Sequence, residues 1–87
     1  MTGVYKIEVV GGDPYGRWPR LRTGDLGMAL RAALSYVREM EKELGAALPI
    51  KVTGPGYDGT PLSAAEVRTA VWVFGTDRDR FGMLQSN

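Results

Sequence analysis

The chain has 87 residues, of which 44% are apolar and 24% are charged, and its formal net charge at pH 7 is +1. This length accommodates one domain, so we expect residues 1–87 to form a single unit. The sequence contains neither Cys nor His, which excludes disulfides, Cys/His zinc sites and catalytic pairs built on a thiolate or an imidazole. The small net charge excludes a strong electrostatic field that steers the protein to a nucleic acid or a membrane.

The first quarter of the chain predicts a β-hairpin at about residues 4–22. Apolar and polar residues alternate from 4 to 10, which is typical of a half-buried strand. A turn-rich segment at 11–16 follows, and we interpret 17–22 as the second strand. Because Pro19 has no amide hydrogen to donate, this strand belongs at a sheet edge. An irregular loop is the alternative interpretation of this second segment.

The middle of the chain predicts one long amphipathic helix at about residues 25–44. Asp25 is suited to cap its first turn, and Gly45 is suited to the left-handed conformation that ends a helix. Apolar residues at alternating spacings of four and three form a continuous stripe along the helix. The stripe consists of Leu26, Leu30, Ala33, Val37, Met40 and Leu44.

The last third of the chain is harder to interpret. Residues 48–54 predict a third strand, and a loop rich in Gly and Pro follows it up to residue 62. Ser63 and Glu66 have the spacing of a capping box, which opens a helix. The β-branched and aromatic residues that follow favour a strand instead, and we predict a strand at about 66–75.

Together these elements predict an α+β fold in the order β-β-α-β-β, with an antiparallel sheet packed on one long amphipathic helix. A short turn or tail completes the chain after residue 75. A domain of this size, without disulfides or metal, depends on one compact core or on a partner subunit.

Two motifs resemble ligand-binding sites, but the residues around each motif do not suit the ligand. Residues 54–59 match the G-x-G-x-x-G pattern of dinucleotide sites. Pro55 removes a backbone donor, no helix follows at once, and the chain is too short for a doubly wound sheet. Asp77 and Asp79 have the spacing to share a cation, but the neighbouring arginines, Arg78 and Arg80, neutralise their charge.

The remaining polar residues do not predict a catalytic site. The carboxylates are scattered or lie on the outer face of the predicted helix, and the lysines fall on predicted polar faces, where a depressed pKa is not expected. We therefore expect no enzymatic activity, no cofactor and no bound metal. The lack of Cys favours the cytoplasm, and the longest apolar run is too short to span a membrane.

The leading prediction is a non-catalytic protein-interaction module, such as a small regulator, adaptor or inhibitor of the kind that phages and mobile elements encode. The predicted last strand is apolar on both faces, whereas one helix covers only one face of a sheet. An apolar face left over in a small domain usually meets another chain, so we predict a homodimer or another protein partner. The predicted interface residues are Trp72, Phe74, Trp18 and Leu21.

The alternative prediction is a nucleic-acid-binding protein that uses the segment 17–22. Arginine binds phosphate through two parallel hydrogen bonds, and an exposed tryptophan stacks on a base. The candidate residues are Arg17, Trp18, Arg20 and Arg22. The electrostatic support is weak, because residues 1–24 carry four basic and two acidic side chains, a net charge of +2.

Overall fold

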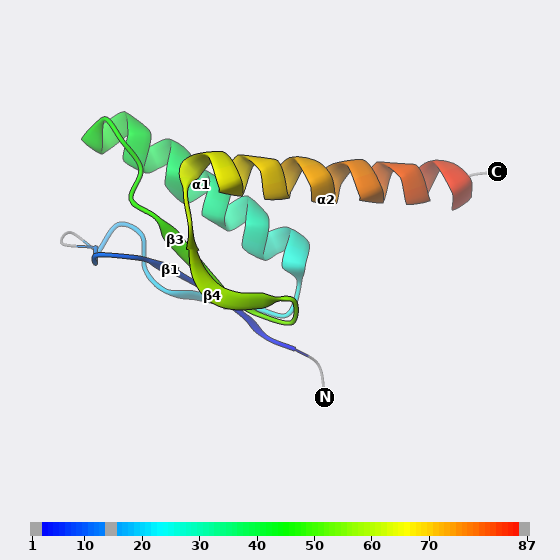
Figure 1. The fold of residues 1–87 in the computed structure, drawn as a ribbon, viewed down its shortest axis with the longest axis horizontal. Helices are drawn as coiled ribbons and strands as arrows, with labels where there is room; N and C mark the ends of the chain where they lie inside the picture. Colours follow the sequence, from blue (N-terminus) through cyan, green and yellow to red (C-terminus); the bar gives the residue numbers. More distant parts are fainter. Residues whose placement is uncertain (1–2, 14–15, 86–87) are drawn as a thin grey trace.

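The computed structural model describes residues 3–13 and 16–85, the last ten of these by their backbone alone. It confirms a small α+β fold with a four-stranded antiparallel sheet. The predicted order β-β-α-β-β with one helix was wrong, because the chain forms two helices in the order β-β-α-β-β-α. Two helices lie on one face of this sheet, and the other face is uncovered (Figure 1). The elements in chain order are β1 (Tyr5–Val9), β2 (Leu21–Thr23), α1 (Leu26–Leu44), β3 (Ile50–Gly54), β4 (Tyr57–Leu62) and α2 (Ala64–Gln85). Within the sheet the strands lie in the order β2-β1-β3-β4.

The core lies between α1 and the two central strands. On β1 and β3, Ile7 pairs with Val52 and Val9 with Ile50, and all four side chains are buried. The predicted apolar stripe of α1 covers them, because its 3.6-residue period turns these side chains to one side. Four members of the stripe are buried: Leu30, Ala33, Val37 and Met40. Its last member, Leu44, is exposed.

Both predicted caps of α1 are confirmed. The Asp25 carboxylate accepts a hydrogen bond from the Gly27 amide at 2.9 Å, which satisfies one of the free N–H groups of the first turn. Gly45 has φ +82°, and its amide donates to the Glu41 carbonyl at 3.0 Å. A residue with a Cβ is strained at this φ, so glycine is favoured where the helix ends.

The prediction of a loop between residue 54 and residue 62 was wrong, because most of it forms the edge strand β4. Pro55 and Gly56 make the turn, and the φ of +81° at Gly56 suits the third position of a type II turn. Pro61 faces Lys51 in the register. An edge strand tolerates proline, because the amides on its open side need no ladder partner.

The second predicted strand is shorter than expected. Residues 17–20 are irregular, and β2 begins at Leu21. Trp18 is only 2% exposed and belongs to the core. A strand through this segment would place Trp18 and Arg20 on the same face of the sheet. The irregular backbone instead allows the Trp18 indole to enter the core while Arg20 stays exposed.

The predicted strand at 66–75 was also wrong, because these residues belong to α2. The capping box is formed: the Ser63 amide donates to Glu66 Oε1 at 3.0 Å, and the Glu66 amide donates to Ser63 Oγ at 3.2 Å. Val67 is fully buried, and Val71 and Phe74 follow it at helical spacing. Burial against α1 therefore outweighs the β propensity of this segment.

The capping box makes the start of α2 sensitive to acid. Hydrogen bonds from Ser63 lower the pKa of Glu66 below its ordinary value of 4.5. A lowered pKa in the folded state stabilises the protein above the ordinary pKa, and this contribution is lost as the pH falls through the folded value. We expect the stability difference between wild type and Glu66→Ala to shrink below pH 4.5, as measured by urea unfolding across pH. A difference that stays constant from neutral to acidic pH would contradict the role of the carboxylate.

Candidate functional site

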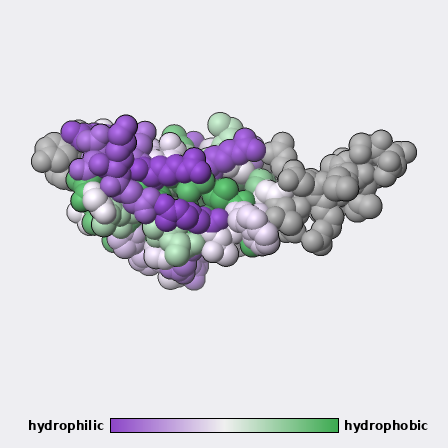
Figure 2. Space-filling view, turned by 90° about the horizontal axis from the view of Figure 1, so that it is seen from above, coloured by the Kyte–Doolittle hydropathy of each residue, from purple (hydrophilic) through white to green (hydrophobic). Residues whose placement is uncertain are grey.

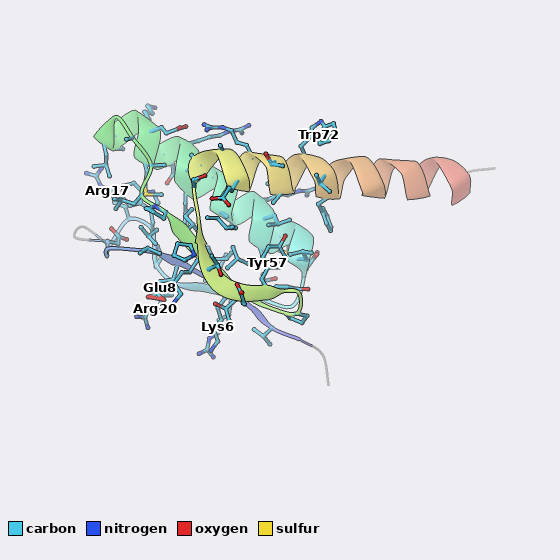
Figure 3. All side chains as sticks on the ribbon, in the orientation of Figure 1. Lys6, Glu8, Arg17, Arg20, Tyr57 and Trp72 are labelled. Carbon is cyan, nitrogen blue, oxygen red and sulfur yellow. The ribbon has the colours of Figure 1, made fainter. Side chains whose placement is uncertain are left out.

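The most exposed aromatic side chain of the described residues lies on α2. Trp72 is 69% exposed and points away from the sheet and α1 (Figure 3). Val73 beside it is also exposed. The C-terminal half of α2 runs beyond α1 and the sheet (Figure 1). Trp72 therefore stands close to the point where the helix leaves the domain.

A shallow apolar hollow of about 380 Å³ lies along the same helix where it passes β4. It is lined by Leu62, Ala65, Glu66, Thr69 and Ala70. The small side chains on α2 leave room for another helix or a large side chain to approach the backbone closely. Val73 is placed one turn after Thr69, so it continues this apolar flank towards the free half of the helix.

The opposite flank of α2 is occupied by α1. The Phe74 ring lies against Gly27, where a Cβ would be only 2.9 Å from a ring carbon. The absence of a side chain at Gly27 thus allows the two helices to cross closely. Arg68 of α2 also pairs with Glu41 of α1. Phe74, a predicted interface residue, is half-buried and packs inside the domain.

Seen from above the helices, hydrophobic residues fill a strip between hydrophilic ones (Figure 2). The outer side of α1 is basic, because Arg31, Arg38 and Lys42 are exposed there at helical spacing. None of these three has a hydrogen-bond or ion-pair partner among the described residues. The helix side of the domain therefore combines an apolar flank on α2 with a charged face on α1.

The segment that contains Arg17 and Trp18 is held by one face of α1. The indole Nε1 of Trp18 donates to Glu39 Oε2 at 2.8 Å, and Arg17 pairs with Glu43 at 3.0 Å. The hydroxyl of Tyr36 donates to the carbonyl of Pro19 at 2.8 Å. Burial, together with the negative charges of nearby carboxylates, raises the pKa of Tyr36, so it keeps the proton that it donates.

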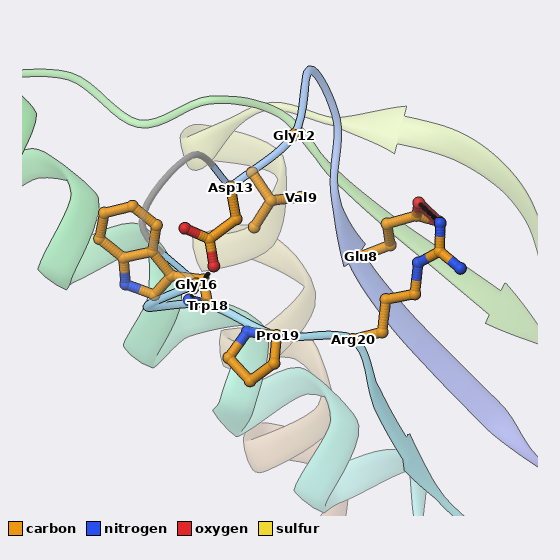
Figure 4. Close-up of a pocket in the computed structure, with 8 residues that line it drawn as sticks. All are labelled: Glu8, Val9, Gly12, Asp13, Gly16, Trp18, Pro19 and Arg20. Carbon is orange, nitrogen blue, oxygen red and sulfur yellow. Dashed lines mark hydrogen bonds and ion pairs between the residues drawn. The ribbon is translucent and has the colours of Figure 1, made fainter.

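A hollow of about 280 Å³ lies between this segment and β1 (Figure 4). Its lining residues are Glu8, Val9, Gly12, Asp13, Gly16, Trp18, Pro19 and Arg20. Asp13 accepts a hydrogen bond from the Trp18 amide through one oxygen, and its other oxygen is buried without a partner among the described residues. Glu8 at the rim pairs with Arg20 at 3.1 Å. The described lining offers two carboxylates and one guanidinium, with no hydroxyl or amine nucleophile beside them.

The uncovered face of the sheet carries the other cationic residues. Lys6, Glu8 and Arg20 lie on the side away from the helices (Figure 3). Lys6 is opposite Arg22 on β2, and Glu8 is opposite Lys51 on β3. These pairings place three basic side chains on this face, and the ion pair of Arg20 with Glu8 adds a fourth.

The structure therefore separates the four residues of the predicted nucleic-acid site. Arg20 and Arg22 lie on the open sheet face, Arg17 turns to the end of α1, and Trp18 is in the core. Lys6 and Lys51, which were not among the predicted site residues, join the two arginines. Their positions on alternating strands were visible, but the strand pairing that brings them beside Arg22 was not.

The predicted interface residues are separated in the same way. Trp72 and Leu21 are exposed, Phe74 packs against α1, and Trp18 is buried. The hollow along α2 was missed, because residues 66–75 were interpreted as a strand. A helical interpretation of the capping box would have placed Ala65, Thr69 and Val73 on one flank.

Comparison of the chain with protein-family models, with curated proteins and with solved structures gave no match. In the described residues, no three Asp or Glu side chains gather closely enough to hold a metal ion. Within the same part of the chain, neither helix is both long enough and apolar enough to cross a membrane.

Proposed function

We propose that this protein is a non-catalytic protein-interaction module that self-associates through α2. The observation that carries this proposal is that α2 leaves the domain while Trp72, at the point of departure, is 69% exposed. Large aromatic side chains of this kind dominate the energetics of protein interfaces. The proposed interface is the flank of α2 that carries Trp72, whereas the sequence predicted an interface on a face of the sheet.

The free half of α2 needs a packing partner to remain helical. Isolated helices shorter than about 12–15 residues are marginal in water, and half of this 22-residue helix is shorter than that. Its sequence includes Gly75 and Gly82, each of which lowers helix stability by about 1 kcal/mol relative to Ala. A partner helix supplies the packing that intrinsic propensity does not.

A second copy of the chain fits this surface. The sequence from Asp77 to Arg80 alternates two acidic and two basic residues, so it has no net charge that repels an identical segment. Two copies related by a two-fold axis present the same surface to each other. In such a pair, the Trp72 indole of each protomer fills the hollow at Ala65 and Thr69 of the other.

Trp72→Ala is expected to weaken the dimer. Truncation of an aromatic anchor costs about 2 kcal/mol or more. The symmetric dimer loses two such anchors, so we expect a cost of about 4 kcal/mol, which corresponds to a rise of about 1,000-fold in the dimer dissociation constant. Sedimentation equilibrium measures the change, with a protomer mass of 9.5 kDa. Far-ultraviolet circular dichroism of the variant shows whether the domain stays folded.

The matched control is Met28→Ala. Met28 is 60% exposed on α1, so its truncation removes exposed apolar surface outside the proposed interface and is expected to leave the dissociation constant unchanged. A wild-type protein that stays monomeric up to submillimolar concentration would overturn the proposal. So would a Trp72→Ala protein that dimerises as tightly as wild type.

A further inference from the structure

The open face of the sheet carries a like-charge pair that no described carboxylate compensates. Lys6 and Arg22 face each other directly across β1 and β2. Like charges in this position destabilise an antiparallel pair. Neither side chain, nor Lys51 on β3, has a hydrogen-bond or ion-pair partner within the part of the chain that the structure describes.

The carboxylates of the described residues are already engaged elsewhere. Glu8, the nearest acidic residue on this face, pairs with Arg20 at 3.1 Å. Each of the other seven described carboxylates accepts a hydrogen bond from a different group. They are Asp13, Asp25, Glu39, Glu41, Glu43, Asp58 and Glu66. The described residues therefore offer no free carboxylate to neutralise Lys6 and Arg22, which leaves this face open to an anion from another molecule.

The face also has a place for such an anion. A hollow of about 190 Å³ lies over β1 and β2, and Lys6, Arg20 and Arg22 line it together with Glu8. Because Arg20 neutralises Glu8, the charge left at this hollow is positive. Lys51 extends the basic surface onto the next strand, so the cations form a track across three neighbouring strands.

We infer that this face binds the phosphodiester backbone of a single-stranded nucleic acid through Lys6, Arg22 and Lys51. A strand of nucleic acid presents one phosphate per nucleotide, which suits cations distributed along a track, and arginine matches phosphate geometry. The face is a sheet surface, and no helix lies on it to enter the groove of a duplex. No aromatic side chain of the described residues lies on this face to stack on a base. The binding is therefore weak and independent of the nucleotide sequence.

The test is a fluorescence-anisotropy titration of labelled oligothymidylate with the full chain. Three phosphate contacts to a single strand predict a slope of about −2 for log K against log salt. Binding is therefore expected to weaken by about 20-fold between 50 and 200 mM salt. The absence of binding at about 50 mM salt would overturn the inference, because phosphate contacts are strongest at low salt.

The decisive variant is Lys6→Gln with Arg22→Gln, and its matched control is Arg38→Gln with Lys42→Gln. Each double variant removes two positive charges from an exposed surface, but the control pair lies on the outer side of α1. The first is expected to lose about tenfold in affinity and about 1.4 units of salt slope, while the control stays within twofold of wild type. Thermal unfolding of the first variant is expected at or above the wild-type temperature, since a repulsive pair is removed.

Three results would overturn the inference. Equal weakening by the two double variants would assign the binding to net charge and not to the sheet face. Tighter binding to a duplex of the same length would exclude a single-strand site. Competition by polyglutamate as effective as that by oligothymidylate, at equal charge, would assign the face to an acidic protein partner.

Discussion

Replacing Trp18 with Ala is expected to destabilise the domain by about 3–5 kcal/mol, the usual range for truncation of a buried aromatic residue. The Trp18 side chain is 2% exposed and belongs to the core cluster with Val9 and Val37. Its loss removes this packing and also leaves Glu39 without the indole donor. Because a small single core rarely supplies more than about 3–5 kcal/mol, the variant is expected to be largely unfolded at 25 °C. Urea unfolding followed by circular dichroism measures the effect.

Trp18→Phe separates the two contributions. Phenylalanine retains most of the buried ring area but has no N–H group to donate to Glu39. It is therefore expected to lose about 1–2 kcal/mol, much less than the Ala variant. A Trp18→Ala protein as stable as wild type would show that Trp18 is a surface residue, as the predicted strand at 17–22 required.

The parts of the fold predicted correctly are those in which local pattern and tertiary burial agree. The helix at 25–44 has a continuous apolar stripe, an Asp N-cap and a Gly at its end, and all of these signals indicate the same element. The alternation in β1 and β3 likewise matches the burial of every second residue. In such segments a residue's neighbours along the chain determine the structure that its tertiary contacts then stabilise.

The errors occurred where two local signals disagreed. In residues 63–75, the capping box of Ser63 and Glu66 favours a helix, while the run from Val71 to Phe74 favours a strand. Whether this segment forms a helix or a strand depends on packing against α1, because Gly27 provides the space into which the Phe74 ring packs. That space is a property of the folded domain, so propensity alone does not reveal it. In β4, similarly, Pro61 and Gly59 indicate a loop until the strand is known to lie at an edge.

The predicted site residues were affected by the same choices between helix, strand and loop. Trp18 and Trp72 are both flanked by strand-forming or basic residues, and the sequence does not distinguish the buried one from the exposed one. Trp18 is buried because it packs into the core cluster with residues of α1 such as Val37, and Glu39 on the same helix accepts its indole hydrogen. Lys6 and Arg22 meet only through the pairing of β1 with β2. The residue types were therefore predictable, while their grouping into surfaces required the fold.

Val67→Asp is expected to detach α2 from α1 and to unfold the domain, and Thr69→Asp is expected to leave it folded. Val67 is fully buried, so an aspartate there is an unpaired charge inside the core, and its expected cost of about 4 kcal/mol or more is comparable with the whole stability of a small domain. Thr69 is exposed on another side of the same helix. Its substitution is expected to change stability by no more than about 0.5 kcal/mol.

This pair of variants tests the helix directly, because the strand interpretation makes a different prediction. Residues 67 and 69 lie on the same face of a strand but on different faces of a helix. The measurement is urea unfolding at a protein concentration where the chain is monomeric. If the two substitutions destabilise the domain equally, this segment is a strand and α2 is not the interaction surface. A loss confined to Val67→Asp leaves the flank formed by Ala65, Thr69 and Val73 on the outside of the domain, where the dimer proposal requires it.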